Sequence, residues 1–154
     1  MSLKIREVRL AYKTVGVQEE ASPMVDRADK VAGYMAGAFD SHPDQESFWV
    51  VMLNRKNRAT ARQMITLGTQ TAALAHPREV FRAAILGAAA AIICVHNHPS
   101  GDPSPSAADM VMTRQLREAA AAVDIPILDH VIIGERQHDP LGRGYYSFRE
   151  AGLL

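Results

Sequence analysis

The segment AAIICVHNHPSGDPSPSAAD, residues 90–109, combines a strand signal, a stiff loop and a helix start. Its first six residues are apolar without interruption, which is typical of a strand buried on both faces. The strand signal ends at the HNH triplet, residues 96–98. Residues 99–105 then hold three prolines and one glycine, a composition typical of a rigid, irregular loop. Ser106 predicts the start of a helix that runs to about residue 123.

On either side of this segment, apolar residues recur at strand or helix spacing. The β-prone run SFWVVML, residues 47–53, is followed by a polar turn over 54–58, so it would pair with the next strand as a hairpin. Helices mixed with a hairpin and one crossover indicate an α/β protein, and we expect an α-β-α sandwich around a mixed β-sheet. The further elements expected are strands over 3–12, 60–68, 127–134 and 145–148, and helices over 23–39 and 78–88.

The length and composition predict one globular domain. The chain has 154 residues, of which 47% are hydrophobic and 22% are charged. A chain of this size buries enough surface to fold without a disulfide or a metal staple. We expect the domain over residues 23–154, with Ser22-Pro23 as the cap and first position of its first helix. Residues 1–22 are expected to form an N-terminal strand and extension.

Charge and cysteine content exclude several classes of protein. Lysine and arginine together number 17, as do aspartate and glutamate, so the formal net charge is zero. This balance argues against a dedicated nucleic-acid binder and against a polybasic membrane patch. The longest apolar run, residues 83–95, is shorter than the roughly 20 residues of a membrane span. The single cysteine, Cys94, is typical of a reducing compartment, so we expect a soluble, cytoplasmic protein.

The residues that point to chemistry are His96, His98 and Asp109. If the strand continues through the two histidines, their side chains lie on the same face, and imidazole is the commonest protein ligand of zinc. Asp109, at the start of the next helix, can fold back as a third ligand. Three protein ligands with an open fourth position are typical of catalytic zinc, where the pKa of a bound water falls from 15.7 to about 7. The alternative is structural: Ser106-x-x-Asp109 is also a helix cap with an acidic third residue, and capping is compatible with ligation.

These residues resemble a known family. His96-x-His98, seven residues, Ser106, two residues and Asp109 resemble the JAMM (MPN+) metallopeptidase signature. The surrounding sequence is similar to the RadC family in particular, over roughly residues 23–152. The similarity includes HPREVFRAAI before the motif and LDHVIIG and YYSFREAG after it. Asn97 stands where JAMM peptidases usually have serine or threonine, but asparagine is the usual residue in RadC-like sequences. The resemblance implies an α-β-α sandwich similar to cytidine deaminases.

The resemblance also implies roles for particular residues. His96, His98 and Asp109 would hold Zn²⁺, and Ser106 would donate a hydrogen bond to the oxyanion that forms during hydrolysis. The family has a glutamate general base upstream, and the matching position is Glu46; by its sequence alone, Glu46 is an isolated glutamate before a strand. Glu79 is the alternative base. The implied activity is a zinc-dependent hydrolase, a metallopeptidase or isopeptidase that acts on a protein or peptide.

Other interpretations remain open. The chain could be a DNA-repair-associated or protein-interaction module of the RadC family that binds metal without peptidase activity. Long members of the family carry an N-terminal helix-hairpin-helix region, and residues 1–22 are too short for one, so we expect a stand-alone domain. A homodimer is a candidate assembly that nothing in the sequence fixes. The zinc-deaminase signature is excluded, because it requires a pair of cysteines. His130, within LDHVIIG, is more simply a packed strand histidine than a residue that supports the metal ligands.

Overall fold

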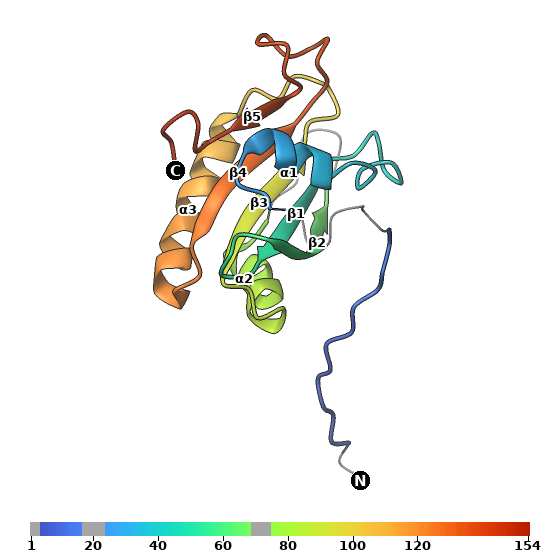
Figure 1. Cartoon of the computed structure of the whole chain (residues 1–154), viewed down its shortest axis with the longest axis vertical. Coiled ribbons are helices and arrows are strands. Elements are labelled where there is room, and N and C mark those ends of the chain that lie inside the picture. Colours follow the sequence, from blue (N-terminus) through green and yellow to red (C-terminus); the bar gives the residue numbers. More distant parts are fainter. Residues whose placement is uncertain (1–3, 17–23, 69–74) are drawn as a thin grey trace.

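A five-stranded sheet with the order β2-β1-β3-β4-β5 forms the centre of the computed structural model, which describes residues 4–16, 24–68 and 75–154 (Figure 1). Only β3 and β4 run parallel; the other neighbouring strands are antiparallel. In chain order the elements are α1 (Ala28–Tyr34), β1 (Ser47–Leu53), β2 (Ala59–Leu67), α2 (Pro77–Leu86), β3 (Ala91–Asn97), α3 (Ala107–Val123), β4 (Ile127–Ile133) and β5 (Tyr145–Ser147).

The apolar run of the opening segment forms β3, the middle strand. All seven of its residues are buried, as expected for a strand covered on both faces. It extends further than the apolar residues alone, because His96 still pairs with Phe48 of β1 and with Ile132 of β4. The first histidine of the triplet is therefore fixed by strand pairing on both sides.

Alternation along the strands separates two apolar layers. On one face, Phe48, Val50, Ile92 and Cys94 belong to a core that is covered by α2 and α3. On the other face, Val51, Leu53, Ile93 and Val95 pack with residues of α1. Figure 1 shows α1 across one face of the sheet, with α2 and α3 behind it. The expected α-β-α sandwich around a mixed sheet is confirmed.

The crossover from β3 through α3 to β4 places the polar residues 98–106 at the carboxyl end of β3. Ser106 caps α3: its side chain accepts a hydrogen bond from the Asp109 backbone N–H, and the Asp109 carboxylate accepts one from the Ser106 N–H. The helix ends at Asp124, which adopts a left-handed conformation with φ 55°. The expected start at Ser106 and end near residue 123 are both confirmed, and Asp109 lies in the first turn.

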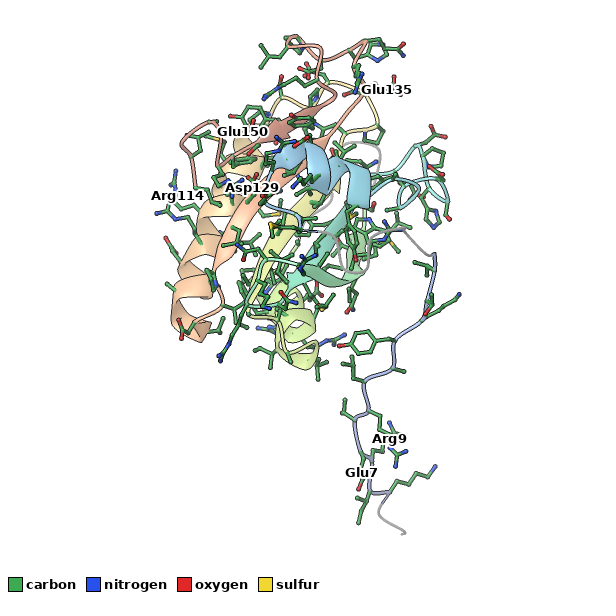
Figure 2. The ribbon with its side chains drawn as sticks, in the orientation of Figure 1. Glu7, Arg9, Arg114, Asp129, Glu135 and Glu150 are labelled. Carbon is green, nitrogen blue, oxygen red and sulfur yellow. The ribbon has the colours of Figure 1, made fainter. Side chains whose placement is uncertain are left out.

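Two expectations about the N-terminal part are wrong. Residues 4–12 form no strand, and Ile5 and Val8 are 88% and 83% exposed, because an extended segment without a neighbouring strand cannot pair its backbone groups. Figure 2 shows Glu7 and Arg9 on this extended segment. The helix expected over 23–39 is regular only over Ala28–Tyr34.

The shortening of α1 has a local cause. Two glycines, Gly33 and Gly37, lower helix propensity near its end, and Gly37 adopts a φ of +77°, which an α-helix does not allow. At the other end, Met24 is extended and forms an isolated bridge with Arg58, so the chain there is strand-like. The proposed cap at Ser22-Pro23 lies outside the described residues.

Among the residues that the structure describes, no helix is both long enough and apolar enough to cross a membrane.

Candidate metal centre

The candidate metal ligands His96, His98 and Asp109 converge at the carboxyl end of β3, the middle strand of the sheet. The Nε2 atoms of the two histidines lie 3.1 Å apart. Asp109 faces both: its Oδ1 lies 3.3 Å from Nε2 of His96, and its Oδ2 lies 3.2 Å from Nε2 of His98. The three residues can each offer one ligand atom, all within 4.8 Å of one another. The structure thus brings together the three residues that the sequence singles out as metal ligands.

Each of the three side chains is held by its own part of the fold. His96 is the sixth residue of β3 and is fully buried, whereas His98 follows the strand. The other ring nitrogen of His98, Nδ1, lies 2.9 Å from the backbone carbonyl of Asp102 in the proline-rich loop. Asp109 is oriented by the capping box of α3. The stiff loop and the helix start therefore position two of the three groups.

The carboxylate dominates the electrostatics. Burial would raise the pKa of Asp109, but the close contacts with the ring nitrogens of His96 and His98 and the hydrogen bond from the Ser106 N–H hold it well below its usual range. Burial would lower the pKa of His98, but hydrogen bonds with Asp109 and the Asp102 carbonyl, and then the nearby negative charges, outweigh burial and raise it. The cluster therefore attracts positive charge.

The donor set fits a zinc ion. Zn²⁺ is commonly held by imidazole nitrogens and carboxylate oxygens, and three protein ligands leave a position open for water or substrate. The donor atoms here are two imidazole nitrogens and a carboxylate oxygen that face a common point. A divalent cation at that point would satisfy an aspartate that is kept ionised in a largely buried setting.

Glu46 lies beside this cluster. It is 8% exposed, and its Oε1 lies 3.9 Å from Nε2 of His98. The Asn97 carboxamide holds the chain on both sides of Glu46: Oδ1 accepts a hydrogen bond of 2.8 Å from the Ser47 N–H, and Nδ2 donates one of 3.0 Å to the Gln45 carbonyl. The backbone carbonyl of Glu46 also accepts from the Gly68 N–H at 2.7 Å. The backbone on both sides of Glu46 is thus held by the residue between the two histidines.

The other two candidates are exposed. Ser106 keeps its hydroxyl oxygen engaged as the cap of α3, and its hydroxyl hydrogen is available for a further acceptor, so its oxyanion role stays a prediction. Glu79 lies exposed in the first turn of α2, where a carboxylate complements the helix start. Of the two carboxylates considered as general base, Glu46 is the one with a contact to the cluster.

Two further residues contact the cluster from within the core. His130, of β4, is 1% exposed, and its Nε2 lies 2.8 Å from Nδ1 of His96. Its own Nδ1 lies 2.6 Å from the Thr113 hydroxyl, which donates a hydrogen bond of 2.7 Å to the Asp109 carbonyl. Burial holds the pKa of His130 well below its usual range. His130 is therefore not only a packed strand residue. Thr113 went unnoticed in the sequence, although its spacing of four from Asp109 places both on one helix face.

The fold and the site together define a domain of the α-β-α class with a histidine-histidine-aspartate centre at the end of its middle strand. Comparison with protein families gives a match to the RadC-like JAB domain over residues 25–153. The chain belongs to this family.

Individual relatives carry the same family resemblance. A UPF0758 protein of Chlorobium phaeovibrioides is 46% identical over 148 residues, which cover 95% of this chain and 60% of the relative. A UPF0758 protein of Chlorobium luteolum is 47% identical over 130 residues, or 84% of this chain and 55% of the relative. One from Listeria monocytogenes is 41% identical over 142 residues, or 92% and 60%. The chain thus spans little more than half the length of these relatives.

Proposed function

We propose that the chain is a zinc-dependent hydrolase of amide bonds, a metallopeptidase or isopeptidase whose substrate is a protein or peptide. The observation that carries the proposal is the convergence of His96, His98 and Asp109 at a point that also lies beside the Glu46 carboxylate. Membership of the RadC-like JAB family supports the same reading. Metal ligands and a nearby carboxylate are the two components that metal-assisted hydrolysis requires.

Each residue has a distinct task in this proposal. A bound zinc ion supplies Lewis acidity, which makes water nucleophilic near neutral pH and polarises a carbonyl group. Glu46 accepts a proton at a carboxylate oxygen from the attacking water and delivers it to the leaving nitrogen. Ser106, with its oxygen already engaged as a helix cap, directs its hydroxyl hydrogen to the developing oxyanion. The two hydrogen bonds of the Asn97 side chain hold the backbone around Glu46, so that the carboxylate stays near the ligands during proton transfer.

The first experiment measures metal binding. The purified chain, His96→Ala and His98→Ala are loaded with zinc, desalted and analysed for metal content, with Glu79→Ala as the matched control. We expect about one zinc per chain for the unsubstituted protein and for the control, and loss of zinc in both histidine variants, since each removes one of three ligands. Equal zinc content in all four proteins would contradict the proposed ligand set.

The second experiment measures hydrolysis. The zinc-loaded chain is incubated with a library of internally quenched peptides and with lysine-branched peptides that carry an isopeptide bond. For any substrate cleaved, Glu46→Gln should reduce turnover about 10²- to 10⁴-fold while zinc is retained, because the amide cannot take up the proton. Glu79→Gln should leave turnover unchanged. Full turnover in Glu46→Gln would show that Glu46 is not the base.

The remaining interpretation is a metal-binding module that acts in DNA repair or protein interaction without hydrolysis. Zinc binding with no cleavage in either library favours this alternative. A gel-shift titration with duplex DNA at physiological ionic strength then distinguishes its two forms, because nonspecific DNA binding weakens steeply with salt. The net charge of zero provides no general attraction for DNA.

A further inference from the structure

We propose that Thr113 and His130 are positioning residues that fix the tautomer of the His96 ring. They keep the ring hydrogen on Nδ1, so that Nε2 presents its lone pair to the candidate metal centre. This inference rests on the proposed function in one respect, namely that His96 is a metal ligand. One line of hydrogen bonds runs from the backbone carbonyl of Asp109 in α3 to the ring of His96.

The line starts at the Asp109 carbonyl. The Thr113 hydroxyl lies 2.7 Å from this oxygen, which can only accept a hydrogen bond. The single hydroxyl hydrogen of Thr113 is therefore directed to Asp109. Towards any other neighbour, the hydroxyl oxygen acts as an acceptor.

The neighbour on that side is His130. Its Nδ1 lies 2.6 Å from the Thr113 oxygen, so Nδ1 must carry the hydrogen. The ring is 1% exposed and packs against two phenyl rings. Its centroid lies 4.7 Å from that of the stacked Phe148 ring and 5.6 Å from that of the edge-on Phe48 ring. An apolar environment of this kind favours the uncharged imidazole. A neutral ring with its hydrogen on Nδ1 has a lone pair on Nε2.

That lone pair determines the state of His96. Nε2 of His130 lies 2.8 Å from Nδ1 of His96, so Nδ1 of His96 carries the hydrogen and donates it. As a metal ligand, His96 would then coordinate through Nε2, the atom 3.3 Å from the Asp109 carboxylate. Second-sphere partners that orient a ligating histidine are common at metal sites, and here the partner is another imidazole with a fixed hydrogen.

The alternative tautomer would disable the site. With its hydrogen on Nε2, His96 would donate directly to the Asp109 carboxylate, and both ligands would be occupied with each other. The His96–Asp109 contact alone does not prevent this arrangement, because a separation of 3.3 Å is long for a hydrogen bond but still compatible with one. The Thr113–His130 pair selects between the two forms from the far side of the ring.

The test compares Thr113→Val, which removes the hydroxyl at nearly constant size, with Thr113→Ser, which keeps it. Thr66→Val is the matched control, since the Thr66 hydroxyl is buried without a hydrogen-bond partner among the described residues. Zinc affinity is measured by competition with a chromophoric chelator. Thr113→Val should bind zinc about 10- to 100-fold more weakly. Thr113→Ser and Thr66→Val should stay close to the unsubstituted protein.

The second readout is spectroscopic and needs no metal. Two-bond ¹⁵N–¹H spectra of the metal-free chain at about pH 8 report which ring nitrogen of each histidine carries the hydrogen. We expect the hydrogen of His96 on Nδ1 in the unsubstituted chain and in Thr113→Ser. In Thr113→Val we expect a substantial fraction on Nε2, because His130 loses the acceptor that fixed its own hydrogen.

The two readouts separate the two hypotheses. If the unsubstituted chain binds no zinc, the proposed function fails, while the spectra still decide the tautomer of His96. The inference is overturned if the metal-free chain carries the His96 hydrogen on Nε2. It is also overturned if Thr113→Val keeps both affinity and tautomer, or if Val and Ser weaken zinc equally.

Should Thr113→Val not fold, substitutions at His130 address the same question. His130→Gln can accept from His96 and donate to Thr113, whereas His130→Leu can do neither. We expect tighter zinc binding in the glutamine variant than in the leucine variant. Equal loss in both would mean that the packing of the ring, and not its hydrogen bonds, supports the site.

Discussion

At the scale of single residues, the protonation of His98 links stability to metal binding. In the metal-free chain its pKa lies above the usual value of about 6.5, mainly because hydrogen bonds with Asp109 and the Asp102 carbonyl outweigh burial. A group whose pKa is raised on folding contributes stability that is complete below its unfolded pKa. That stability is lost as the pH rises through the folded value.

We therefore predict that the stability difference between the metal-free chain and His98→Gln depends on pH. The advantage of histidine should be full near pH 6 and should shrink towards pH 9, measured by urea unfolding at each pH. Taking the difference removes the contribution of His130, whose buried neutral ring is common to both proteins and has the opposite pH dependence. An advantage that grows with pH would contradict the raised pKa.

Zinc affinity should show the reverse trend. Metal must displace the proton of His98, so we expect affinity to fall on acidification already above pH 6.5. The lowered pKa of Asp109 does not contribute to the pH dependence of zinc affinity in this range, because the carboxylate loses its proton far below neutral pH. Competition titrations between pH 6 and 8 measure the slope, and a constant affinity across that range would exclude imidazole ligation.

The identities of the clustered residues could be read from the sequence, but their contacts could not. The spacing of His96, His98 and Asp109 was enough to single them out, because a strand residue, the residue just after the strand at the same parity, and a helix start converge locally. His130 and Thr113 contact the cluster only after β4 and α3 have packed, and no local pattern specifies that contact. The role of Glu46 depended on family resemblance, since it joins the cluster through the pairing of β1 with β3.

At the scale of elements, Asn97 connects the end of β3 to the start of β1. Its two hydrogen bonds to the chain around Glu46 are made at a residue that is 6% exposed. We predict that Asn97→Ala lowers the free energy of unfolding by about 1–3 kcal/mol, since the Ser47 N–H is left without its partner. Gln63→Ala, at an exposed position of β2, is the control.

The same variant separates the ligands from the proposed base. Because the Asn97 side chain is not among the three metal-binding candidates, we expect zinc content to be retained, whereas any hydrolytic turnover falls as Glu46 loses its support. Zinc content is measured as above. Loss of zinc with unchanged stability would show that Asn97 acts on the ligands and not on the β1 segment.

A close contact between two loops involves the loop that touches the candidate metal centre. A Cβ atom at Gly134, directly after β4, would collide with the Gly101 carbonyl and lie 2.9 Å from Cδ of Pro103. We predict that Gly134→Ala costs about 1–3 kcal/mol of stability, because the added methyl group forces the proline-rich loop to move. Zinc affinity should fall as well, since this loop carries the Asp102 carbonyl that holds His98.

The control for that substitution is Gly33→Ala in α1, where a Cβ atom would meet nothing within 4 Å. Alanine there should leave stability unchanged or raise it by up to about 1 kcal/mol, as expected for glycine in a helix. Thermal unfolding measures both variants. Equal effects at the two positions would mean that the loop adapts to the methyl group without cost.

Most of the elements could be predicted from local patterns. The β-prone run of β1, the buried run of β3 and the Ser106 cap of α3 are each determined within a few residues. The N-terminal strand failed for a different reason: a strand exists only when another strand pairs with it, and periodicity alone does not supply a partner. Likewise, α1 is shortened by glycines within an otherwise helical spacing.

At the scale of the whole molecule, a bound ion would connect the sheet with α3, because its ligands come from both. Zinc that binds only the folded chain stabilises it by about 2.7 kcal/mol when free zinc is 100 times the dissociation constant. For a domain of this size we predict a Tm increase of about 5–11 °C, measured by scanning calorimetry. His96→Ala should show no such increase, and an equal increase in that variant would place the ion elsewhere.

The buried position of Cys94 in the middle strand has a practical consequence. Burial raises the pKa of its thiol far above the usual range, so the reactive thiolate does not form in the native chain. Burial also keeps alkylating reagents from reaching the sulfur atom. As the single cysteine of the sequence, it reacts only when β3 is exposed to solvent. The rate of iodoacetamide incorporation therefore reports how often β3 becomes exposed, so the single thiol is a built-in probe of opening at the centre of the sheet.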